Sequence, residues 1–248
     1  MARSAPSPSV CTERAAGPTQ LNLLSGFELR CGDDAVRVPT NVARMLAFLA
    51  LRSRPQHRAT VAGTLWLDSP EDRAAANLRT ALWRARRVDR GLVLSQGSYL
   101  RLGPSVEIDL DDMVARARQL TADPTADVEP VTSAEGLSDD LLPEWYDDWV
   151  MLERERLRQI RLHSLEALCT RLSTLGRHGL AIEAGLAAVR AEPLRESAHR
   201  AVIRAHLAEG NASEALRQYD SLVVLLRDNL GIAPGHATRE LVAALRSR

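Results

Sequence analysis

The succession of apolar patterns between residues 39 and 102 constrains the fold of this chain more than any other feature. Pro39-Thr40-Asn41 begins a predicted helix that ends before Pro55. Its buried face is expected to hold four residues at helical spacing: Val42, Met45, Leu46 and Leu49. A second, shorter helix is predicted from about Thr60 to Leu67. Two helices therefore follow each other closely.

The third predicted helix has the clearest start signal of the chain. Ser69 can cap it, Pro70 fits its first position, and Asp72 lies three residues after the cap. The helix is expected to run to about Arg87. Its apolar face would be made of five residues: Ala74, Leu78, Ala81, Leu82 and Ala85.

Short β-like segments surround these helices. Residues 92–94 and 100–102 alternate about a Gln-Gly-Ser turn and predict a hairpin. Leu21 to Val38 is interrupted by glycine and predicts two or three short strands, while Val106 to Leu110 fits either one more strand or a linker. Three helices, the last one long, followed by a hairpin are the order of a winged helix-turn-helix, and the preceding strands match its response-regulator type.

The rest of the chain predicts almost only helices. One begins near Asp109, and residues 121–137, rich in Pro, Thr, Asp and Gly, are predicted as a loop. Five helical segments follow: Glu144–Thr174, Leu180–Glu192, Arg195–Glu209, Ala212–Leu230 and Ala237–Arg246. Gly176 and Gly210 occupy equivalent breaks 34 residues apart, which is the tetratricopeptide period.

The predicted fold class is therefore mainly α with a small β component. Residues 1–20 are expected to be a disordered arm, because they hold three prolines and no apolar run. Residues 21–110 would form the winged helix-turn-helix domain of response-regulator type, and residues 111–248 an all-α, tetratricopeptide-like domain.

The charge is divided between these parts. All 32 basic residues are arginine, and the net charge is zero. Between Asn41 and Arg101 there are 11 arginines and 4 acids, whereas Gln119 to Glu153 holds 10 acids and no arginine. Guanidinium groups pair with phosphate and with guanine edges, so the basic part points to nucleic acid.

Several enzyme classes are excluded by the same composition. Without lysine the chain has no P-loop, no kinase ATP site and no Schiff base. Glu196 and His199 have the spacing of a helix-bundle metal site, but no second such pair exists, so a packing histidine is the favoured interpretation. No cofactor or metal is expected. The acids of the segment Glu144–Trp149 resemble a catalytic pair, but its aromatic residues are expected to dock it onto the helical domain.

The cysteines and the N-terminal residues indicate the cellular compartment. The spacing of Cys11, Cys31 and Cys169 fits neither a zinc site nor a disulfide framework, so free thiols in a reducing cytoplasm are expected. The first twenty residues do not read as a signal peptide, and no apolar stretch is long enough to span a bilayer.

The outward face of the third helix carries the candidate DNA contacts. With Leu78 and Leu82 at the centre of the buried face, the outer face and its flanks hold eight residues: Arg73, Ala76, Asn77, Arg79, Thr80, Trp83, Arg84 and Arg87. On the hairpin, Tyr99 and Arg101 point away from the core side. These side chains suit guanine, adenine, thymine methyl and phosphate groups. The alternative is a solvated helix face, with Trp83 as a packing residue.

Several segments carry a resemblance to a known family. Four look like its DNA-binding half: Leu24–Leu29, Arg44–Leu51, Ala75–Arg84 and Val106–Leu110. Four others look like the bacterial transcriptional activation domain: Leu141–Pro143, Trp145–Trp149, Arg154–Arg158 and Glu192–Glu196. Together, from about Leu21 to the end, the chain resembles a Streptomyces antibiotic regulatory protein (SARP).

The resemblance implies a transcriptional activator of antibiotic and other biosynthetic gene clusters. Such proteins bind promoter direct repeats, usually as pairs side by side on double-stranded DNA, and contact RNA polymerase and its sigma factor. The recognition helix of the family falls on Ser69–Arg87 and its wing on Leu92–Leu102. A cytoplasmic, nucleoid-associated protein that is not an enzyme is expected. The alternatives are a helical tetratricopeptide-like adaptor and a ligand-gated repressor.

Overall fold

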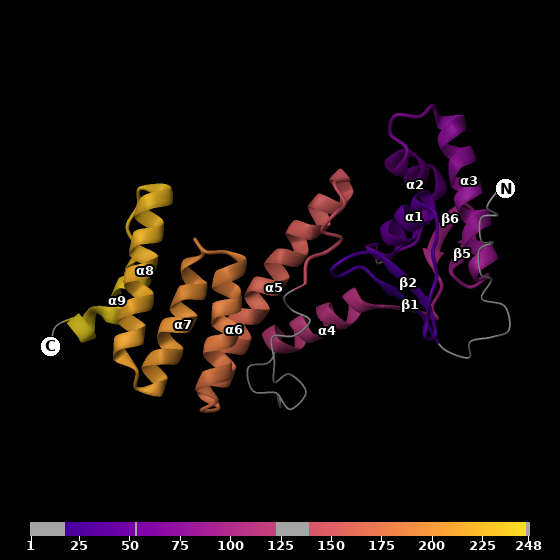
Figure 1. Ribbon diagram of the computed structural model, residues 1–248. Helices are drawn as coiled ribbons and strands as arrows, with labels where there is room; N and C mark the ends of the chain where they lie inside the picture. The colour runs from indigo at the N-terminus through magenta and orange to yellow at the C-terminus, as the bar shows by residue number, and fades with distance from the viewer. Residues whose placement is uncertain (1–17, 53, 123–138, 247–248) are drawn as a thin grey trace, which may run out of the picture. The chain divides into compact units, whose positions relative to one another are not determined.

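The computed structural model describes residues 18–52, 54–122 and 139–246, and it separates into two compact units (Figure 1). The first unit combines the chain up to Asp112 with Asp140–Arg154, and the second begins at Met113 and continues from Glu155. Most of the loop expected at 121–137, and the arm expected at 1–20 up to residue 17, lie outside the described residues.

A four-stranded sheet forms one side of the first unit. Its strands are β1 (Thr19–Asn22), β2 (Glu28–Cys31), β3 (Asp34–Ala35) and β7 (Val106–Ile108), in the order β3-β2-β1-β7. β1 runs antiparallel to β2 and parallel to β7. Leu21 faces Leu29 in the register, and both side chains are buried. The expected early strands are confirmed, and residues 106–108 form a strand rather than a linker.

The helices and the hairpin of the first unit follow the predicted order. They are α1 (Thr40–Ala50), α2 (Arg58–Leu65), α3 (Glu71–Val88), β5 (Val93–Gln96) and β6 (Tyr99–Leu102). A short strand, β4 (Gln56–His57), precedes α2 and pairs with β6, which gives a second sheet in the order β4-β6-β5. All five residues expected on the apolar face of α3 are buried. The mainly α fold with a winged helix-turn-helix order is therefore observed.

The aromatic segment Trp145–Trp149 packs in the first unit, so the expectation that it docks onto the helical domain is wrong. The ring of Trp145 stacks on Phe27 with centroids 5.8 Å apart, and Trp149 meets the Phe48 ring edge-on at 5.3 Å. The chain has only two phenylalanines, and both precede the recognition-helix region. The apolar partners of the tryptophans are therefore supplied by the N-terminal half.

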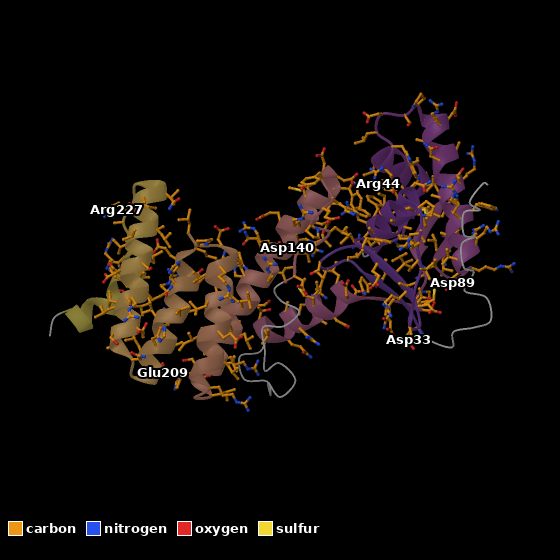
Figure 2. All side chains as sticks on the ribbon, in the orientation of Figure 1. Asp33, Arg44, Asp89, Asp140, Glu209 and Arg227 are labelled. Atoms are coloured by element: carbon orange, nitrogen blue, oxygen red, sulfur yellow. The ribbon has the colours of Figure 1, made fainter. Side chains whose placement is uncertain are left out.

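We name residues 140–154 the clasp segment, because several polar contacts fasten it to the first unit. Arg44 of α1, labelled in Figure 2, forms an ion pair with Asp147. Arg52 pairs with Glu153 at 2.6 Å. The backbone N–H of Leu142 donates to the carbonyl of Leu23 at 2.9 Å. Asp147 therefore forms an ion pair with Arg44 of α1 and does not form a catalytic pair with the neighbouring acids of the segment.

The second unit is helical throughout the part that the structure describes. Its helices, two of which begin in the first unit, are α4 (Asp109–Ala122), α5 (Asp148–Thr174), α6 (His178–Ala191), α7 (Glu196–Glu209), α8 (Ala212–Leu230) and α9 (His236–Arg246). α5 starts four residues later than expected, because residues 144–147 belong to the docked aromatic stretch. Asp148 lies in its first turn, where a carboxylate favours the helix dipole.

The 34-residue spacing corresponds to a repeated helix–turn–helix. Gly176 follows α5 with a φ of 73°, and Gly210 follows α7 with a φ of 86°. This left-handed conformation is costly for residues with a Cβ and explains glycine at both turns. α6, α7 and α8 lie side by side (Figure 1), with α7 packed between the other two. Stacking of this kind is the tetratricopeptide arrangement.

The cysteines differ from one another. Cys169 is a buried free thiol, and burial raises its pKa to about 12. Cys31 is disulfide-bonded, so the expectation of free thiols is wrong at that position. Among the described residues, none of the helices has the length and apolar character required to cross a membrane.

Candidate nucleic-acid interface

The recognition-helix candidate α3 starts without the expected side-chain cap. Pro70 is its N-cap residue, no side chain bonds the free N–H groups, and Glu71 is the first helical residue. The N–H of Ser69 instead donates to the carbonyl of Trp66 at 3.0 Å, which closes the turn after α2. The prediction of Ser69 as cap and Pro70 as first helical residue is therefore wrong by one position.

The outer face of α3 lies where the periodicity placed it. Six of the candidate residues are exposed: Arg73, Arg79, Thr80, Trp83, Arg84 and Arg87. Ala76 and Asn77 are half-buried on its flank. The Thr80 hydroxyl donates to the carbonyl of Ala76 at 3.1 Å, so its methyl group is the part left for outside contacts. Exposed short side chains beside arginine match the major-groove edges of base pairs.

The arginines of this face are not neutralised from within. Among the residues that the structure describes, no carboxylate lies within ion-pair distance of Arg73, Arg79, Arg84 or Arg87. By contrast, Arg44 of α1 and Arg52, two residues beyond the end of that helix, are both paired with acids of the clasp segment. The clasp acids therefore offset the charges of Arg44 and Arg52, and the arginines on the outer face of α3 keep their charge for an external anion.

Trp83 is the largest apolar side chain on this face, with 58% of its surface exposed. The guanidinium carbon of Arg87, one helical turn later, lies 5.1 Å from the centre of its ring. A cation over an indole face is a favourable contact that restricts the arginine. Trp83 is therefore neither a buried packing residue nor an isolated exposed ring, because it supports Arg87.

The hairpin presents Tyr99 and Arg101 on the side opposite the buried Leu100. Both are exposed, and the Tyr99 ring meets His57 edge-on at 5.4 Å. The turn consists of Gly97, with a φ of 57°, and Ser98. The sequence predicted both outward residues, and the structure places them on one strand, β6.

Arg58, at the start of α2, belongs to the same basic surface and was missed by sequence reasoning. Its N–H donates to the carbonyl of Ser98, and its guanidinium donates to the Ser95 hydroxyl at 3.1 Å. Arg86 donates to the same hydroxyl at 3.3 Å, so its side chain contacts the hairpin. A cavity of about 550 Å³ between α2 and α3 is lined by both Arg58 and Arg79. The sequence signal that could have identified Arg58 is its position directly at the start of a helix.

Glu196 and His199, the Glu-x-x-His pair, both form hydrogen bonds within the helical unit. His199 is buried; its Nε2 lies 2.9 Å from the carbonyl of Pro193, and its Nδ1 lies 2.9 Å from the amide nitrogen of Gln218. Burial lowers the pKa of His199. Glu196 accepts hydrogen bonds from the N–H of Gly235 and the hydroxyl of Thr238, at the start of α9. Among the described residues no cluster of metal ligands occurs.

Comparison with known proteins agrees with this architecture. A family model, the bacterial transcriptional activator domain, matches residues 109–246. Among solved structures, the chain is similar to that of Mycobacterium tuberculosis EmbR in complex with a low affinity phosphopeptide, with 22% sequence identity and a TM-score of 0.77. That similarity covers 93% of this chain and 66% of the other, so the chain spans slightly less than two thirds of that structure. None of the curated proteins matches the chain.

The family match extends over more than half of the chain, and the structural similarity includes the winged-helix unit as well. The chain therefore belongs to the bacterial transcriptional activator domain family, and its fold is similar to that of EmbR.

Proposed function

We propose that this activator binds double-stranded DNA sequence-specifically, with α3 in the major groove and the β5–β6 hairpin against the backbone or minor groove. The observation that carries the proposal is the outer face of α3, where Arg73, Arg79, Arg84 and Arg87 have no carboxylate within ion-pair distance among the described residues, whereas Arg44 and Arg52 of the same unit are paired with acids. Arginines neutralise phosphates and release counterions, while the same side chain recognises guanine.

The remaining steps of the proposal are supported by the resemblance to Streptomyces antibiotic regulatory proteins. The protein binds direct repeats at a promoter as adjacent copies, so that contacts between the copies add affinity. It recruits RNA polymerase through its sigma factor and activates a secondary-metabolite gene cluster, such as one for an antibiotic. It acts by binding and not by catalysis, in the cytoplasm and on the nucleoid.

The test is footprinting followed by fluorescence anisotropy on the promoters next to the gene. Arg84→Ala and Arg87→Ala should each weaken binding about tenfold, because a good base or phosphate contact is worth roughly 1–3 kcal/mol. Arg37→Ala, which removes an exposed arginine of the same unit outside α3 and the hairpin, is the matched control and should retain affinity. Unchanged affinity of both α3 variants at moderate salt would refute the assigned face.

The second candidate is a helical adaptor that captures a peptide, favoured by the stacked helices of the second unit. Salt separates the two functions. Wild-type affinity for DNA should fall steeply as salt rises, with a log–log slope of about −0.9 for each phosphate neutralised. An adaptor would show no nucleic-acid affinity to lose. Reporter output on expression then distinguishes activation from ligand-gated repression.

A further inference from the structure

A second cavity lies wholly within the helical unit. It has a volume of about 440 Å³ and is lined by residues of α4, α5 and α7. Its size falls in the range of small-molecule sites, roughly 300–1,000 Å³. It shares no lining residue with the candidate DNA interface.

The internal repeat explains why the space exists. Ala167 of α5 and Ala201 of α7 both line the cavity, and they are 34 residues apart, the period of the repeat. The helices α5 and α7 thus each carry an alanine at the equivalent position of the repeat, where it faces the cavity. The next repeat-related pair, Thr170 and Arg204, lies one turn further along the same wall. A bulkier residue at either alanine would fill the cavity.

The charge of the lining is positive. Arg171 is held in the wall with 8% of its surface exposed, and Arg204 is exposed at the rim. The single lining carboxylate, Glu166, accepts hydrogen bonds from Arg195 at 2.6 Å and from Ser197 at 2.7 Å, so its charge is already offset. Among the described residues, Arg204 has no carboxylate within ion-pair distance.

The hydroxyl groups of the lining are occupied as donors. Thr121 donates to the carbonyl of Ala117, Thr170 to that of Glu166, and Thr174 to that of Arg171. Ser197 donates to Glu166. At the rim, the guanidinium of Arg204 therefore offers N–H donors, and their strongest acceptor is an anionic oxygen. His163 also lines the cavity, and its Nδ1 lies 2.8 Å from the carbonyl of Gln159.

We propose that this cavity between α4, α5 and α7 binds a small organic anion, with a carboxylate or phosphate group at Arg204 over Arg171 and an apolar body against Ala167, Ala201 and Leu120. Ligands of this kind combine an apolar body with few polar anchors, as the lining does. The site goes beyond DNA binding and does not depend on it.

Titration calorimetry of the full chain with three matched probes tests the site. Salicylate carries the carboxylate on an apolar ring, phenyl phosphate carries the phosphate, and salicylamide is the neutral counterpart of salicylate. At least one of the two anions should bind saturably with one site per chain. Salicylamide should bind at least about tenfold more weakly, because hydrogen bonds to charged groups are roughly twice as strong as neutral ones.

Variants separate this site from general attraction to arginine. Arg204→Gln should weaken binding of the anion about tenfold. Ala167→Leu should abolish it by filling the space, with cooperative thermal unfolding retained in both variants. Arg217→Gln, on an exposed arginine of α8 outside the cavity, is the control and should bind like the wild type.

Three results overturn the proposal: equal binding of salicylamide, unchanged anion binding in Arg204→Gln or in a folded Ala167→Leu, or no saturation by either anion up to about 10 mM. DNA affinity of the same variants is measured in parallel. Loss of anion binding with DNA binding intact distinguishes failure of this site from failure of the proposed function.

Discussion

The guanidinium of Arg87 lies over the exposed ring of Trp83, 5.1 Å from its centre, on the outer face of α3. Among the described residues, no carboxylate lies within ion-pair distance of Arg87. In the proposed DNA complex, the two residues have different roles. Arg87 supplies the charge, whereas Trp83 restricts the arginine and contributes apolar surface.

Trp83→Ala and Arg87→Ala should therefore differ in their salt dependence. Both should lower DNA affinity, Trp83→Ala by roughly threefold because the exposed cation–π contact is worth about 0.5–1 kcal/mol. Only Arg87→Ala should reduce the slope of log affinity against log salt, by about 0.9 if it contacts a phosphate. Anisotropy at four salt concentrations measures both. An equal loss of slope in the two variants would contradict this division.

Trp149→Ala should destabilise the first unit. Its ring is 6% exposed and packs against Phe48, so truncation removes a large apolar contact and costs about 3–5 kcal/mol. Tyr146→Ala, three residues earlier in the same segment and 82% exposed, is the control and should change stability by less than about 0.5 kcal/mol. Urea unfolding followed by circular dichroism compares them. Similar midpoints for both variants would show that the clasp segment does not hold the unit.

How far the sequence predicted the structure depends on the range of each interaction. The faces of α3 and β6 follow from local periodicity, so Leu78, Leu82 and Leu100 are buried as expected. The docking of Trp145 and Trp149 depends on partners about a hundred residues away, which periodicity does not encode. The Arg44–Asp147 ion pair also joins residues about a hundred positions apart, so periodicity does not predict that Arg44 is neutralised and is not free to bind an external anion. The cap of α3 differs from the expected one by one residue because Ser69 belongs to the turn after α2, where its N–H donates to Trp66, and Pro70 keeps an extended backbone with a ψ of 149°.

Gly185→Ala should destabilise the helical unit. A Cβ at this position of α6 would lie 2.6 Å from Cγ2 of Val202 and 3.0 Å from the sulfur of Cys169. Overpacking of this kind costs about 1–3 kcal/mol. The control is Gly179→Ala in the same helix, where a Cβ meets nothing within 4 Å and the better helix former should stabilise by up to about 1 kcal/mol. Thermal melts should shift in opposite directions, and shifts of the same sign would contradict the close packing of α6 on α7.

The Cys169 thiol should resist alkylation in the folded protein. Burial raises its pKa to about 12, so the reactive thiolate is scarce at pH 8, and access is blocked as well. Peptide-resolved mass spectrometry after iodoacetamide treatment should find Cys169 unmodified in native buffer and modified in urea. Because the folded pKa lies above the ordinary 9.0, this thiol's contribution to stability is complete below about pH 9 and is lost as the pH rises towards 12. Rapid native labelling would show that the α5–α6–α7 core opens.

His199 should make the helical unit sensitive to acid. The neutral ring satisfies both of its nitrogens, with Nε2–H donating to the Pro193 carbonyl and Nδ1 accepting from Gln218. Burial lowers its pKa below the ordinary 6.5, so the unfolded chain binds a proton more readily. The contribution is therefore complete above about pH 6.5 and is lost as the pH falls through the folded pKa.

Urea unfolding between pH 7.5 and pH 5, a range of about one unit or more on either side of the ordinary histidine pKa, measures this effect. His199→Gln should be less stable at neutral pH, since it replaces a fitted ring, but it should lose less stability on acidification because glutamine does not titrate. His163→Gln, at an exposed histidine of α5, should keep the wild-type slope. All carboxylates are common to the three proteins, so the difference between slopes isolates the buried ring. Parallel curves for wild type and His199→Gln would mean that the imidazole accepts its proton without leaving the Pro193–Gln218 pocket.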